Sequence, residues 1–202
     1  MTERSVLNLN IMAPRTEQQF EIIREERKEQ IMQVALELIA QEGFSNVTIS
    51  KIAARAKISK GLMYNYFDSK EELITEIMMN GFKIFQNAFD PNKDGILTDD
   101  EVHFFIDETF RILKSNIKFW RLYFMIMFQP EVYKLIENHL MEMLKPFMTI
   151  TYNYFKRKGY SDPDAEVTFL GAVLDGISLN FVMNPKGFPL EGVKAKLHKM
   201  YK

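Results

Sequence analysis

The residues best able to do chemistry lie in two clusters, a cationic one between Thr48 and Lys70 and an acidic one between Asp90 and Glu101. The cationic cluster sets five basic side chains against a single acid, Asp68. The basic residues are Lys51, Arg55, Lys57, Lys60 and Lys70. Lysine and arginine bind phosphate, so this stretch is a candidate nucleic-acid surface. The formal net charge of the chain is −1, so such attraction must come from local clustering rather than from overall charge.

Two short helices joined by a tight turn are predicted to carry the cationic cluster. Thr48 and Ser59 each precede a short helical segment, which their hydroxyl oxygens can cap. Ser69-Lys-Glu-Glu72 is a capping signal for a third helix. A compact helix-turn-helix of this kind suits the DNA major groove. The alternative is a capped pair of core helices with a solvated basic face.

The second short helix carries most of the side chains expected to touch DNA. Ser59 and Lys60 stand at its amino end, which points into the groove in such motifs. Gly61 has no Cβ and permits close approach of the backbone. Further contacts are expected from Tyr64 and Tyr66 to phosphate, from Asn65 to a base edge, and from Lys70 to phosphate.

The acidic cluster, residues 90–101, fits the calcium-loop pattern D-x-[DN]-x-[DN]-G-x₅-E in full. Oxygen ligands would come from Asp90, Asn92, Asp94, the Ile96 carbonyl, Thr98 through water, and bidentate Glu101. The alternative is an acidic turn between helices, because Asp-Gly forms ordinary turns and Thr98-x-x-Glu101 is an ordinary capping box. No cofactor is required, and Ca²⁺ is the one ion the sequence suggests.

Composition favours a soluble cytoplasmic protein that is not an enzyme. There are no cysteines, and the three histidines are scattered without metal-ligand spacing. No glycine-rich phosphate loop or nucleophile elbow occurs. The longest strongly apolar run, residues 122–128, is too short to span a bilayer, so no membrane partner is expected.

The periodicity predicts an all-α fold. A long helix is expected from the capping box at Thr16 to Glu42, ending at Gly43. After the helix-turn-helix, further helices are expected over residues 69–89, 98–115, 117–128, 131–158, 163–183 and 189–201. Pro146 should kink or split the helix that contains it.

Between about Arg24 and Ile77 the sequence closely resembles the TetR family of transcriptional regulators. The resemblance rests on Ala35-Leu-Glu-Leu38, Glu42-Gly-Phe44, the Thr48 cap, and Ser59-Lys-Gly-x-x-Tyr-x-Tyr-Phe-x-Ser-Lys-Glu-Glu-Leu73. It implies phosphate contacts from Thr48, Lys60, Tyr64, Tyr66 and Lys70. It implies base-edge contacts from Ser59, Lys60, Leu62 and Asn65. Leu62 replaces the family's common Thr, and Lys57 stands where the turn often has Gly.

The resemblance also implies a domain plan. Residues 1–15 would form an N-terminal tail, 16–70 a three-helix DNA-binding domain, and 71–202 a helical effector-binding and dimerisation domain. The family pairs its last two helices into a dimeric four-helix bundle. The residues assigned to that interface are Phe169, Leu170, Val173, Leu174, Ile177, Leu190, Val193 and Leu197.

Aromatic and methionine side chains crowd the segments around residues 119–128 and 141–148. Most of them are expected simply to pack the core. The resemblance favours a pocket for an apolar or aromatic effector, assigned to Trp120, Phe124, Phe128 and Phe147.

The sequence therefore predicts a DNA-binding regulator, a homodimer on a pseudo-palindromic operator, acting as a repressor relieved by ligand. The alternative is a calcium-responsive binding protein whose primary site is the loop at residues 90–101. Salt-dependent binding to duplex DNA separates the two, because phosphate contacts weaken steeply with salt.

Overall fold

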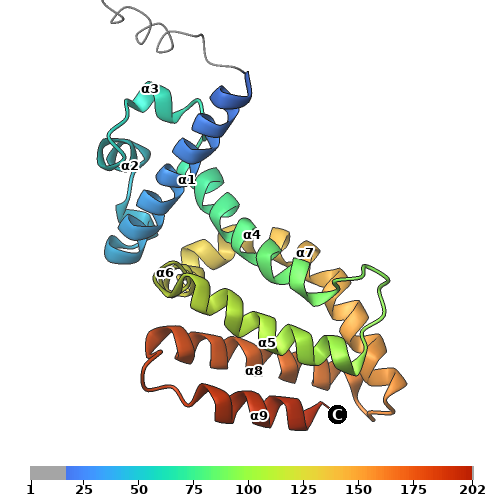
Figure 1. Ribbon diagram of the computed structural model, residues 1–202. Coiled ribbons are helices and arrows are strands. Elements are labelled where there is room, and N and C mark those ends of the chain that lie inside the picture. Colours follow the sequence, from blue (N-terminus) through green and yellow to red (C-terminus); the bar gives the residue numbers. More distant parts are fainter. Residues whose placement is uncertain (1–16, 202) are drawn as a thin grey trace, which may run out of the picture.

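The computed structural model describes residues 17–201, which form an all-helical molecule without strands in that range (Figure 1). The predictions for residues 1–15 and for the Thr16 cap fall outside the described residues. The helices are α1 (Glu17–Glu42), η1 (Phe44–Asn46), α2 (Ile49–Arg55), α3 (Lys60–Met63), α4 (Lys70–Phe89), α5 (Asp99–Ser115), α6 (Ile117–Met127), α7 (Pro130–Arg157), α8 (Pro163–Met183) and α9 (Leu190–Met200). The predicted all-α class is confirmed.

The amino-terminal domain packs α2 and α3 against α1, at one end of the molecule (Figure 1). Helix α1 buries Ile31, Ala35 and Leu38 on one face, and it ends where Gly43 takes a φ of 84°. Met63 and Phe67 are almost fully buried, which fixes the short α3 against the longer helices. Only four residues of the second short helix are α-helical, and residues 64–67 continue it as a tight turn.

Helix α4 joins the amino-terminal domain to the rest of the chain, starting at the Ser69 cap and running alongside α1, α5, α6 and α7. Its closest crossing is at Gly81, where a Cβ would lie 2.3 Å from Cε2 of Tyr123 on α6. The Tyr123 hydroxyl donates a hydrogen bond of 2.8 Å to the Met78 carbonyl. Only glycine therefore permits this packing of α6 on α4.

Helix α7 is continuous from Pro130 to Arg157 and contains Pro146, so the helix is not split, and a kink at Pro146 stays a prediction. Proline removes one backbone donor and crowds the preceding turn, but long helices tolerate this where packing holds both sides. Val132, Ile136 and Leu140 before the proline and Thr151, Tyr154 and Phe155 after it are buried.

In the carboxy-terminal bundle α5 packs against both α8 and α9, and α7 packs against α8 (Figure 1). Helix α8 is long and apolar enough to cross a membrane by length and composition, yet it packs against α5, α6 and α7. Only 22% of its most apolar stretch is buried within the protomer. A large apolar surface of α8 thus remains uncovered by the chain's own described residues.

Candidate nucleic-acid interface and effector cavity

Side-chain caps build the helix-turn-helix, as the sequence predicts. Thr48 Oγ1 accepts the Lys51 backbone N–H at 3.2 Å, and Ser59 Oγ accepts that of Leu62 at 3.0 Å. Ser69 Oγ accepts the Glu72 N–H at 3.0 Å and starts α4. Each cap satisfies a donor that the first helical turn would leave unpaired. The hydroxyl oxygens of Thr48 and Ser59 therefore already accept a backbone hydrogen bond, and any contact they make to DNA would be additional to it.

Most of the predicted DNA-contacting residues share one exposed surface on α3 and the turn after it. Those exposed are Thr48, Ser59, Lys60, Gly61, Leu62, Tyr64 and Asn65, with Tyr66 half-buried. Leu62 and Tyr64 are 40% and 43% exposed, so neither side chain is enclosed by packing within the protomer. A Cβ on Gly61 would meet only Ser59 Oγ, at 4.0 Å. Internal packing therefore does not require glycine here.

The basic side chains of this surface differ in how they are held. Lys51 pairs with Glu42. The Lys70 ammonium donates to the Phe44 carbonyl at 2.7 Å and lies 4.0 Å from the Phe44 ring centroid. Lys70 therefore braces the first turn of α4 against η1, so a phosphate contact from it would have to share or replace this bond. Lys60 extends over Tyr64, with its ammonium 5.9 Å from the ring centroid.

Lys57 occupies the turn between α2 and α3 with a φ of 59°. This left-handed conformation costs a non-glycine residue about 1–2 kcal/mol. The backbone there is fixed on both sides, since the Lys57 N–H donates to Ala54 and the next N–H to Ala53. The turn thus keeps the positive φ that glycine usually supplies, and this chain places an exposed cation there instead.

The acidic loop at residues 90–101 satisfies most of its polar groups internally, but Asp90 Oδ1 is buried without a hydrogen-bond partner. An Asp90 oxygen accepts the Gly95 N–H at 3.1 Å, and an Asp94 oxygen accepts the Ile96 N–H at 2.7 Å. Glu101 accepts the Thr98 N–H at 2.8 Å and completes a capping box for α5. Within residues 17–201 no group of three or more acidic or histidine side chains is arranged to hold a metal ion. These contacts are those of the acidic interhelical turn, and calcium binding stays a prediction.

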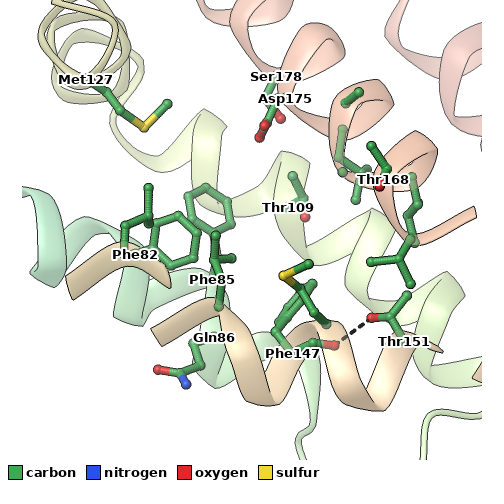
Figure 2. Close-up of a pocket in the computed structure, with 18 of the residues that line it drawn as sticks. Phe82, Phe85, Gln86, Thr109, Met127, Phe147, Thr151, Thr168, Asp175 and Ser178 are labelled. Atoms are coloured by element: carbon green, nitrogen blue, oxygen red, sulfur yellow. Dashed lines mark hydrogen bonds between the residues drawn. The ribbon is translucent and has the colours of Figure 1, made fainter. Parts of the chain in front are cut away.

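A cavity of about 510 Å³ lies between α4, α5, α6, α7 and α8. Figure 2 shows Phe82 and Phe85 reaching it from α4, Phe147 from α7 and Met127 from α6. Three of the four predicted effector residues, Phe124, Phe128 and Phe147, line it. Its volume is that of ordinary small-molecule sites.

Trp120 does not line this cavity, in contrast to the expectation from the sequence. Its side chain is 2% exposed, and its indole N–H donates to the Ile112 carbonyl at 3.0 Å. The ring packs against Phe85, Phe119 and Tyr123 in the core. Periodicity alone placed it with Phe124, one turn later on α6, but the two residues point to different neighbours.

The cavity also contains polar groups that the sequence did not single out. Asp175 projects into it from α8, near Ser178 and on the side facing Phe85 and Thr109 (Figure 2). Desolvation by the surrounding protein raises the pKa of the Asp175 carboxyl. The carboxylate still keeps solvent-accessible surface, because the cavity is wide enough to admit water. No sequence motif identifies Asp175, because the residues around it in the cavity come from helices that are distant in the sequence.

Several polar contacts connect the helices that form the cavity to the amino-terminal domain, among them those of Gln129 and Lys118. Gln129, at the junction of α6 and α7, accepts the Phe44 N–H at 2.9 Å and donates to the Ile39 carbonyl at 3.3 Å. Lys118 on α6 pairs with Glu37 on α1 at 2.6 Å. Helix α4 is a further connection, because it carries Phe82 and Phe85 at the cavity and the Ser69 cap at the helix-turn-helix.

The residues assigned to a dimer interface divide between two faces. Leu170 and Leu174 line the cavity, and Leu197 is 2% exposed. Leu170 and Leu174 therefore face the cavity, whereas Leu197 is buried at the floor of a shallow groove between α8 and α9. Val173, Ile177 and Val193 line this groove, which ends near Met200. Leu190 is half-buried beside the groove, and Phe169 is 49% exposed.

Comparison with known proteins agrees with this geometry. The family model for bacterial regulatory proteins, tetR family, matches residues 31–77. HbdR, a helix-turn-helix transcriptional regulator of Aromatoleum sp. (strain CIB), is 32% identical over 72 residues. That match covers 36% of this chain and 31% of HbdR, so the chain aligns with about a third of that relative's length.

Solved structures share the fold of nearly the whole chain. FadR of Bacillus subtilis in complex with stearoyl-CoA aligns with a TM-score of 0.65 at 20% identity, over 86% of this chain and 96% of that one. NalD of Pseudomonas aeruginosa, the secondary repressor of a multidrug efflux pump, aligns with a TM-score of 0.65 at 19% identity, over 89% and 95%. Residues 31–77, which include the capped helix-turn-helix, therefore match the tetR family of bacterial regulatory proteins, and nearly the whole chain shares the fold of these solved regulators.

Proposed function

We propose that this protein is a sequence-specific DNA-binding regulator whose affinity for its operator is controlled by a small molecule bound in the cavity. The observation that carries the proposal is the exposed surface of α3. There, basic, hydroxyl and amide groups stand beside an exposed leucine and a glycine that packing does not require. Lys60 and Tyr64 suit phosphate, and Asn65 and Leu62 suit a base edge and a thymine methyl.

In this proposal the protein binds DNA as a homodimer. The apolar surface of α8 left uncovered by the protomer, and the groove lined by Val173, Ile177 and Val193, would pack against the same elements of a second copy. A two-fold pair places the two α3 surfaces about 34–36 Å apart, one turn of DNA, so the operator should be pseudo-palindromic. Size-exclusion chromatography with light scattering tests this, and Ile177→Glu should give monomers.

Ligand control would run through α4 and the α6–α7 junction. A ligand among Phe82, Phe85 and Phe128 contacts α4 and the end of α6 directly. The same elements hold the amino-terminal domain through the Ser69 cap and Gln129. A ligand that favours one packing of α4 on α6 would therefore change the spacing of the two α3 surfaces. Repression relieved by ligand fits this arrangement, as does the fold shared with the repressor NalD.

The experiment is selection of bound duplexes from random DNA, followed by affinity measurement on the selected sequence. The double variant Lys60→Ala/Tyr64→Ala should bind the selected duplex at least about 100-fold more weakly, because each protomer loses two contacts to DNA phosphates. Its dimerisation and thermal stability should stay unchanged, because both side chains are exposed. Lys114→Ala, an exposed lysine on α5, is the matched control. Undiminished operator affinity in the double variant would overturn the proposal.

A further inference from the structure

The cavity is apolar almost throughout but carries one charge. Among the described residues that line it, Asp175 alone has a charged side chain, and no lysine, arginine or histidine takes part. Aromatic rings dominate the remaining wall. They are Phe82, Phe85, Phe105, Tyr123, Phe124, Phe128, Tyr133 and Phe147.

Asp175 makes no hydrogen bond or ion pair with any other described residue, and it is the one wall residue without such a partner that carries a charge. Thr109 and Thr151 donate their hydroxyls at 2.8 Å to carbonyls one turn earlier in their own helices. Thr168 does the same at 3.0 Å. Their polar atoms are satisfied within the protein, whereas the Asp175 carboxylate is held over an apolar space without a counter-ion. Asp175 remains accessible to solvent through the cavity, so a bound cation would replace water there and pair with the carboxylate.

Asp175 also stands on the cavity side of α8. It follows Leu174 and precedes Ser178 by three residues, and with Gly171 these residues share the face that lines the cavity. Val173, Gly176 and Ile177 line the groove on the opposite face. The carboxylate is therefore directed at the contents of the cavity, and a dimer partner on the groove side would not neutralise it.

We propose that the effector is a lipophilic organic cation, an amine or quaternary ammonium with an apolar body, whose positive head pairs with Asp175 among the aromatic rings. This inference rests on the proposed function and names the ligand class of the same cavity. Two interactions would stabilise a cation there: the ion pair with the Asp175 carboxylate and the attraction to the faces of the surrounding aromatic rings. An anionic head, such as a fatty-acid carboxylate, meets repulsion from Asp175 and finds no basic residue among the wall's side chains.

The test compares three probes that share a decyl chain: decyltrimethylammonium, decanol and decanoate, each titrated calorimetrically below its micelle concentration. The wild-type protein should bind the cation about tenfold or more tightly than the alcohol, and the anion most weakly. Asp175→Asn keeps the side-chain volume and should remove the preference for the cation while leaving decanol binding within about twofold. Asp164→Asn makes the same change on an exposed residue of α8 outside the cavity and should behave as wild type.

Two results would overturn the inference: equal or weaker binding of the cation than of the alcohol by the wild type, or an unchanged preference in Asp175→Asn. Operator binding by each ligand-free variant is measured in parallel. If wild type and Asp175→Asn both bind the selected duplex but neither prefers the cation, only the inference fails. If the wild type selects no duplex, the proposed regulatory function fails instead.

Discussion

The α3 surface and the cavity are the two candidate functional regions of this chain, and they are built in opposite ways. The α3 surface comes from about a dozen consecutive residues, held by caps at Thr48, Ser59 and Ser69. The cavity takes its walls from five helices between α4 and α8. A site made from consecutive residues keeps its geometry when its own short motif forms, whereas a site made from distant helices depends on how each helix packs on the next. Changes in the bundle should therefore reach the cavity first.

Gly81→Ala should have the largest effect on stability. Its Cβ would collide with the Tyr123 ring, which also lines the cavity, so α6 must move away from α4. We expect a loss of about 1–3 kcal/mol in the free energy of unfolding, measured by urea denaturation. Gly192→Ala in α9, where a Cβ meets no atom within 4 Å, should instead be neutral or stabilising. Equal effects of the two changes would contradict the role assigned to the α4–α6 crossing.

Gln129→Ala sharpens the comparison, because it removes a contact between the amino-terminal domain and the helical bundle without changing a residue of the α3 surface or of the cavity wall. It removes the acceptor of the half-buried Phe44 N–H and the donor to Ile39. An amide left without its partner costs about 1–2 kcal/mol. Thermal unfolding should therefore begin in the amino-terminal domain, visible as earlier loss of hydrogen-exchange protection in α1–α3. Uniform loss of protection over all helices would count against Gln129 as the connection.

Lys57→Gly should move stability and DNA affinity in opposite directions. Glycine adopts the φ of 59° without strain, so the free energy of unfolding should rise by about 1 kcal/mol. The same change deletes an exposed cation beside α3, so operator affinity should fall several-fold and the salt dependence should become shallower. Lys57→Asn, which also tolerates this conformation and lacks the charge, is the control. A rise in both quantities would mean that Lys57 does not face DNA.

The pH dependence of stability tests Asp175. An acid whose pKa is raised on folding destabilises the folded protein above that raised pKa, and this penalty disappears as the pH falls below the ordinary value of about 3.9. Asp175→Asn should therefore be more stable than wild type at neutral pH by up to about 1 kcal/mol, with the difference closing in acid. The other titratable groups lining the cavity are Tyr123 of α6 and Tyr133 of α7. Asp175 is the one carboxylic acid among the described residues that line the cavity. A difference that does not vary with pH would contradict the assignment.

The smallest effect is expected at the acidic loop. Thr98→Ala removes the cap of α5 and should cost about 1 kcal/mol of unfolding free energy, equally with and without calcium. Calorimetry with added calcium, on the native chain and on Glu101→Gln, checks the metal hypothesis directly. A heat of calcium binding that is present in the native chain and absent in Glu101→Gln would show that the loop is a metal site.

The sequence predicted the helices and the caps of the helix-turn-helix well because their signals are local. Caps at Thr48, Ser59, Ser69 and Thr98 and breaks at Gly43 and Gly159 mark the ends of helices in the residues beside them. Side-chain direction within the bundle was not predictable in this way. Trp120 was assigned to the cavity and Leu197 to an outer face, although both are buried in the core, because periodicity gives a helix's apolar face without saying which neighbour covers it. Asp175 was missed for the same reason.

The central claim is that α3 and its flanking turns bind one duplex sequence through phosphate and base contacts. The most direct measurement is the affinity of the wild-type protein for its selected palindrome and for a scrambled duplex, over a range of salt concentrations. The account predicts a steep fall of affinity with salt, on both duplexes, and at least about 1,000-fold tighter binding of the palindrome at physiological salt. Equal affinity for the two duplexes at every salt concentration would contradict it.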